Sequence, residues 1–276
     1  MIVTGIADMR RYCPAILIRE DRDTFTDAIA VAEDLIMTEI LGTDLYNKLG
    51  GETEDSPLRV KAQRAIALEA FATKISSVDV VLHDTGFGVE NSESFQAASR
   101  TRIEALKENT RRDRDAAVDT LVRFLMETVE HDDWRSTPQY DMLNAGLVNT
   151  LREVREFAIL TPEATPRMPQ DWEGFRDFRP KMTDALWGLI AARTGNGFVQ
   201  AMQDGVRART LTPQQKQALF LMKWVVVNAA LGNTGQAEFY LARLLALLAN
   251  DAAAFPEYER PTAKEKENRA VMNFLT

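Results

Sequence analysis

The placement of proline most constrains what this chain can fold into. Proline is absent between Pro57 and Pro138, whereas four prolines fall between Pro162 and Pro180, both ends included. A proline inside a helix removes a backbone hydrogen bond and clashes with the preceding turn. The first stretch can therefore hold long helices, and residues 161–170 are predicted to form a proline-rich linker.

On both sides of that linker, apolar residues recur every three to four positions, which is typical of amphipathic helices. In residues 25–41 one such face contains Phe25, Ile29, Ala32, Leu35, Ile36 and Ile40. We expect an all-α fold with one helical subdomain at 1–160, a second at 171–250 and a polar tail at 251–276. The first subdomain is predicted to contain a long charged helix at 95–130.

Residues 78–89 break the helical pattern. Several β-branched side chains precede the sequence Gly86-Phe-Gly88, so we expect an extended arm or a small hairpin between two helices. An extended segment of this kind can add a strand to a neighbouring molecule. The residues predicted to make such an interaction lie within the arm: Val80, Leu82, Asp84, Gly86, Phe87, Gly88 and Val89.

The two subdomains share an order of landmarks. Each has a helix that begins near a phenylalanine, a glycine 17 residues later, and then a proline that opens another helix. These landmarks are Phe25, Gly42 and Pro57 in the first subdomain and Phe178, Gly195 and Pro213 in the second. The shared order predicts an internal repeat. The alternative is that any two helical hairpins can be aligned in this way.

The net charge of −8 is divided unevenly along the chain. Residues 1–160 carry 19 basic and 29 acidic side chains, whereas residues 161–276 carry 14 and 12. Two unlike halves could present complementary faces to neighbouring copies in a head-to-tail assembly, or the difference could reflect only solvated helix faces. The acidic total argues against bulk binding of nucleic acid.

Few residues suit catalysis or metal binding. One cysteine, Cys13, and two histidines exclude an internal disulfide framework and leave little material for Cys- or His-based metal sites. The best candidate ligands are Glu127 and His131, at i and i+4, with Asp132 and Asp133, although a solvated cluster is the more ordinary interpretation. We assign no catalytic, cofactor-binding or metal-binding residue, and expect no cofactor and no enzyme activity.

Other motifs have ordinary explanations. The sequence Arg111-Arg-Asp-Arg-Asp115 could bind phosphate, but its interleaved acids favour salt bridges along a helix. The apolar runs at 219–231 and 239–249 are too short to span a membrane and are predicted to be buried helices, with the leucines at 241–248 in a core or a subunit interface. The N-terminus lacks the pattern of a secretory signal, so we expect a cytoplasmic protein with no membrane partner.

Several segments resemble known proteins. Four of them resemble a family of uncharacterised, mainly helical proteins encoded in Bacteroidales genomes and prophages. The similar segments are Phe25-Thr-Asp-Ala-Ile-Ala-Val-Ala-Glu33, Ile40-Leu-Gly-Thr-Asp-Leu-Tyr46, Asp84-Thr-Gly-Phe-Gly-Val89 and Phe255-Pro-Glu-Tyr258. The helical opening also resembles the small head–tail connector (adaptor) proteins of tailed phages, although this chain carries two such units.

The connector resemblance implies a virion neck protein that assembles as a ring between portal and tail, and it implies no catalytic residues. We therefore expect a non-enzymatic structural protein of prophage origin whose partners are further copies of itself and other virion proteins. Such a protein would be found in the bacterial cytoplasm or in a phage particle. The alternatives are a monomeric helical module that binds a peptide or small ligand, and a metal-dependent enzyme that uses Glu127 and His131.

Overall fold

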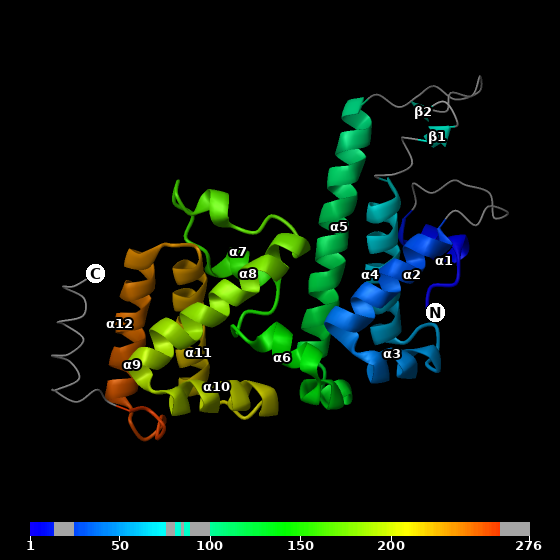
Figure 1. The fold of residues 1–276 in the computed structure, drawn as a ribbon. Helices are drawn as coiled ribbons and strands as arrows, with labels where there is room; N and C mark the ends of the chain where they lie inside the picture. The colour runs from blue at the N-terminus through cyan, green and yellow to red at the C-terminus, as the bar shows by residue number, and fades with distance from the viewer. Residues whose placement is uncertain (14–24, 76–80, 84–85, 89–99, 260–276) are drawn as a thin grey trace. The chain divides into compact units, whose positions relative to one another are not determined.

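A computed structural model describes residues 1–13, 25–75, 81–83, 86–88 and 100–259 of the chain (Figure 1). The fold of these residues is all-α except for one small two-stranded ladder, which confirms the predicted fold class. The chain divides into two compact units, residues 1–141 (unit 1) and residues 142–276 (unit 2).

Unit 1 is built around one long helix, α4 (Pro57–Ile75), which packs against α1, α2 and α5. The surrounding segments are α1 (Ile6–Tyr12), α2 (Thr26–Ile36), the π-helical turn η1 (Met37–Leu41), α3 (Thr43–Gly50) and α5 (Arg100–Glu127). A 3-10 helix, η2 (Val129–Ser136), follows them, and the boundary between the units falls within the next helix, α6 (Pro138–Asn144). Small buried side chains on α4, such as Ala62, Ala65 and Ala70, let neighbouring helices approach closely.

Unit 2 is likewise built around one helix, α11 (Pro213–Ala230), which packs against α7, α8, η4 and α12. The other segments are α7 (Leu151–Phe157), η3 (Thr165–Arg167), α8 (Trp172–Ala185), the π-helical turn η4 (Leu186–Ala191), α9 (Ala192–Thr194), α10 (Asn196–Ala208) and α12 (Thr234–Asn250). The predicted capping box opens α11, because Thr212 accepts from the amide of Gln215 and Gln215 accepts from that of Thr212.

The two units repeat one architecture, which confirms the predicted internal repeat. The order α1, α2, η1, α3, α4, α5 in unit 1 matches α7, α8, η4, α10, α11, α12 in unit 2. In each, a helix runs into a π-helical turn that a glycine with positive φ follows, directly in unit 1 (Gly42, 76°) and after the short α9 in unit 2 (Gly195, 89°). A proline then opens the central helix.

The π-helical turn of unit 1 leaves backbone carbonyls that side chains from η2 and α6 satisfy. The buried Trp134 donates through Nε1 to the Ile40 carbonyl at 2.6 Å, and Gln139 donates to the Thr38 carbonyl at 3.0 Å. In unit 2 the buried Thr194 hydroxyl donates to the Ile190 carbonyl at 3.0 Å. Each unit therefore stabilises the same turn by its own means.

The proline-rich stretch 161–170 differs from the expected linker. It lies inside unit 2, and the boundary between the units falls after Asp141. The side chain of Asn233 donates to the Ile159 carbonyl at 2.7 Å and contacts the Thr161 hydroxyl at 3.2 Å, and Ala164 is fully buried. Prolines exclude a regular helix here, but these contacts hold the stretch as an ordered loop.

The predicted arm forms a small hairpin. Strands β1 (Val81–His83) and β2 (Gly86–Gly88) pair antiparallel, with Leu82 opposite Phe87. The hairpin is an addition to the repeat, because residues 76–99 connect α4 to α5, whereas residues 231–233 alone connect the matching α11 and α12. Helix α5 is also longer, with 28 residues against 17 in α12, and it confirms the predicted charged helix over residues 100–127.

Candidate functional site

The aromatic surface of unit 2 consists of five side chains: Phe157, Phe220, Trp224, Phe239 and Tyr240. Phe157 ends α7, the next two belong to successive turns of α11, and the last two belong to α12. A three-residue turn joins α11 to α12 as an antiparallel pair, which brings Trp224 beside Tyr240. The pairing of these two helices therefore assembles the surface.

The five rings form a continuous chain of contacts. Trp224 and Tyr240 stack with centroids 4.8 Å apart and planes 15° apart. Phe157 meets Phe220 edge-on at 5.4 Å and Trp224 edge-on at 5.6 Å, and Phe239 meets Tyr240 in the same way at 5.2 Å. Stacked and edge-to-face pairs at these distances are favourable arrangements, so the rings hold one another in place.

The aromatic surface runs from the core into solvent. Phe157 is only 5% exposed, whereas Phe220 is 50% exposed and Phe239 is 55% exposed. Apolar area left in water costs about 25 cal/mol per Å² relative to burial. Two half-exposed phenylalanines on a base of ordered rings are therefore typical of a surface that another molecule covers.

Charge is sparse on the two helices that carry four of the five rings, whereas α7, which carries Phe157, contains two arginines and two glutamates. Helices α11 and α12 together carry only Lys216, Lys223, Glu238 and Arg243. Lys223 is already engaged, because it forms an ion pair with Glu153 and lies 5.8 Å from the Phe157 ring. Arg243 is exposed and lies 5.7 Å from the ring of Phe239. Few charges, several aromatic rings and an arginine are the composition of protein–protein interface cores.

Part of this surface differs from the sequence-based prediction. The predicted buried helices at 219–231 and 239–249 do bury side chains such as Leu221, Val226 and Leu244. The prediction was wrong for Phe220 and Phe239, whose side chains are about half exposed. The signal was present, since α11 and α12 are apolar on more faces than one core requires.

The predicted arm residues are described only in part. Leu82, Gly86, Phe87 and Gly88 lie in the two paired strands, whereas Val80, Asp84 and Val89 lie outside the described residues. The ladder fixes a register in which Val81 faces Gly88 and His83 faces Gly86. The role of the arm in an interaction stays a prediction.

The candidate metal ligands do not converge. Each acid pairs with a basic side chain at 3.3 to 3.4 Å: Glu127 with Arg123, Asp132 with Arg135, and Asp133 with Lys48. His131 has non-helical backbone angles, and its ring packs against Phe124 at 6.1 Å. Within the described ranges, no group of three His, Cys, Asp or Glu side chains could hold a metal ion. The metal-dependent enzyme therefore has no ligand set among these residues.

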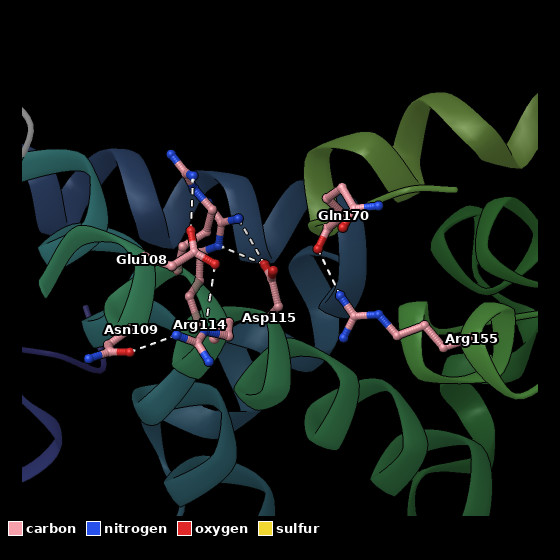
Figure 2. A network of polar contacts seen from close by, with 8 residues as sticks. Glu108, Asn109, Arg114, Asp115, Arg155 and Gln170 are labelled. Atoms are coloured by element: carbon pink, nitrogen blue, oxygen red, sulfur yellow. Dashed lines mark hydrogen bonds and ion pairs between the residues drawn. The ribbon is translucent and has the colours of Figure 1, made fainter. Parts of the chain in front are cut away.

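The basic cluster of α5 forms salt bridges, as predicted. Arg111 and Arg112 both lie 3.6 Å from the carboxylate of Glu108 (Figure 2). Arg114 lies 2.8 Å from Asp115 and 3.6 Å from Glu69 on α4, and all three of these side chains are largely buried. The guanidinium groups are thus engaged by nearby carboxylates, which leaves them poorly suited to phosphate.

Cys13 is a buried thiol whose Sγ lies 3.7 Å from the Ala67 carbonyl. Burial, with a smaller contribution from Asp113, raises the pKa of this thiol to about 12. A thiol with that pKa is protonated at neutral pH and is a poor nucleophile. Cys13 therefore belongs to the core of unit 1.

Across the part of the chain that the structure describes, no helix is both long enough and apolar enough to cross a membrane. The model of a family of unknown function, DUF6712, matches residues 29–142 and 194–268. These two stretches cover more than half of the chain and include residues of both units. No curated protein and no solved structure matches the chain.

Proposed function

We propose that this chain, which belongs to the DUF6712 family of unknown function, is a non-enzymatic structural protein that assembles with further copies of itself. The observation that carries this proposal is the aromatic surface. Its base is ordered by stacked rings, while Phe220 and Phe239 remain half exposed. An ordered apolar surface with few charges is suited to binding another protein.

The tandem architecture supports self-assembly. Two units of one architecture differ in charge, because residues 1–141 carry 17 basic and 27 acidic side chains and the remaining residues carry 16 and 14. Contacts between unlike surfaces of successive copies are heterologous, and such contacts close into rings or extend into filaments. A chain with one acidic unit and one weakly basic unit is suited to contacts of that kind.

The finer part of the proposal is a place in a phage particle. The resemblance of the segment 25–46 to tailed-phage connectors supports a ring in the virion neck, between portal and tail, in a protein of prophage origin. Its partners would then include other virion proteins. The copies would assemble in the bacterial cytoplasm before they enter the particle.

Negative-stain electron microscopy of the purified full chain tests the connector-like role. We expect closed rings of one copy number, because a neck protein must match the symmetry of the parts that it joins. Open filaments without closed rings would contradict the connector-like role, although they would still agree with self-assembly. Particles the size of a single chain would contradict both.

The same aromatic surface also favours a second candidate, a monomeric helical module that binds a peptide. An amphipathic peptide helix could cover Phe220 and Phe239 as readily as a second copy could. A protein that stays monomeric at high concentration would favour this candidate.

A further inference from the structure

We propose that the aromatic surface of one copy binds the outward face of α2 in a second copy. This inference rests on the proposed self-assembly and specifies which surfaces meet. The two surfaces lie on different units, so each copy would contact one neighbour through the aromatic surface of unit 2 and another through the α2 face of unit 1. The result is a head-to-tail chain of contacts.

The outward face of α2 is acidic with an apolar centre. Asp27, Val31, Asp34 and Thr38 follow one another at helical spacing and are all exposed. Val31 is 62% exposed, whereas Ile29 and Ile36 on the opposite side are almost fully buried. The segment 26–41 contains no lysine or arginine, and of its four acidic residues Asp27 and Asp34 are exposed on this face whereas Glu33 is buried. This face therefore offers one apolar contact between two carboxylates.

The aromatic surface offers the complementary features. Phe239 and Arg243 lie one turn apart on α12, so an exposed ring and an exposed cation stand side by side. Ala242 and Ala246 are exposed on the same helix, and Ala30 is exposed on α2. Small residues on both helices allow close approach, while Val31 can cover a phenylalanine and Asp27 or Asp34 can pair with Arg243.

Neither unit carries both faces, which argues for contacts between unlike units. With Gly42 matched to Gly195, the position of Val31 corresponds to Asp184 on α8. With Pro57 matched to Pro213, the position of Phe220 corresponds to Arg64 on α4. Unit 2 therefore lacks the apolar centre of the α2 face, and unit 1 lacks the exposed phenylalanine of α11. If two copies of the same unit paired, the contact would lack either the exposed phenylalanine of α11 or the apolar centre of the α2 face.

Charge reversal tests this pairing on the full chain. The variants are Asp34→Arg and Arg243→Glu, and Asp44→Arg on α3 is a matched control because Asp44 is exposed and lies outside the α2 face. Self-association is followed by light scattering over a range of concentrations, and circular dichroism checks that each variant keeps its helices. We expect each reversal on the two faces to raise the Kd of self-association about tenfold or more, since like charges then meet at the contact.

An equimolar mixture of Asp34→Arg and Arg243→Glu gives the decisive result. Each variant then supplies the face that the other needs, so we expect association to return toward that of the wild type while the control stays unchanged. If the wild type assembles but the two reversals behave like Asp44→Arg, this pairing is wrong and the proposed self-assembly stands. Weakened variants that the mixture does not restore also overturn the pairing. A wild type that stays monomeric removes both proposals.

Discussion

At the scale of single residues, Gly42 determines the backbone conformation that connects the π-helical turn η1 to α3. Its backbone has φ of 76° and ψ of 155°, a region that only glycine occupies readily. A Cβ at this position would lie 2.9 Å from Oε1 of Gln139, the side chain that satisfies the Thr38 carbonyl. Gly195 has a similar backbone conformation, which indicates that a glycine at this position belongs to the repeated architecture.

The substitution Gly42→Ala should therefore lower the free energy of unfolding by about 1 to 3 kcal/mol. The matched control is Gly50→Ala, because Gly50 lies in α3 and a Cβ there meets nothing within 4 Å. We expect the control to be neutral or to stabilise by up to about 1 kcal/mol. Urea denaturation measures both, and equal effects of the two substitutions would show that the turn does not require glycine.

Cys13 and Tyr46 give unit 1 a dependence on alkaline pH. Burial raises the pKa of Cys13 from 9.0 to about 12, and burial together with the nearby Glu33 raises the pKa of Tyr46 from 10.0 to about 12. As pH rises, the unfolded chain loses these protons before the folded chain does. Stability is thus constant below the ordinary pKa of each group and falls as pH rises toward 12.

The free energy of unfolding should therefore fall above about pH 9, and Cys13→Ala should reduce that fall. The difference between wild type and variant is expected to shrink by up to about 1.4 kcal/mol for each pH unit above 9. Denaturation curves at several alkaline pH values measure it. A difference that does not change with pH would show that Cys13 titrates normally in the folded protein.

At the scale of helices and strands, local signals predicted most of the fold. Pro57, Pro213 and the capping box at Thr212 fix where the central helices begin, because these signals act within one turn of the chain. The structure of residues 161–170 could not be predicted from local signals alone. Its prolines exclude a regular helix, but only the distant Asn233 makes it an ordered loop of unit 2.

Periodicity alone could not show which apolar face of α11 and α12 stays exposed, for a related reason. Whether Phe220 is buried depends on which helices pack around α11, and an apolar residue has the same period on a covered or an uncovered face. The arm was easier to recognise, because the residues of β1 and β2 lack helical periodicity altogether. Its strands were predicted, whereas the interaction assigned to it stays a prediction.

The arm is also the element whose removal is most informative. Deletion of residues 79–89 should raise the Kd of self-association several-fold, because the arm would no longer add its strands to a neighbour. The helical circular dichroism signal should stay intact, since the hairpin is an addition to the repeated helices. Sedimentation of the deleted and wild-type chains measures the effect. The same oligomer size in both would contradict an interaction role for the arm.

At the scale of the whole molecule, the repeat and the charge difference point to the same account. The chain contains two units of one architecture, of which unit 1 is acidic and has the added arm, and unit 2 has the aromatic surface. Such differences between repeated units are expected when each unit meets a different partner surface. The function proposed here depends on surfaces and on contacts between copies.

The most direct test of this account is the absolute mass of the full chain, measured by multi-angle light scattering at rising concentration. If the copies self-assemble, the mass rises to a fixed multiple of 31.0 kDa, and salt lowers it because charged faces contribute to the contact. A mass of 31.0 kDa at every concentration would contradict self-assembly.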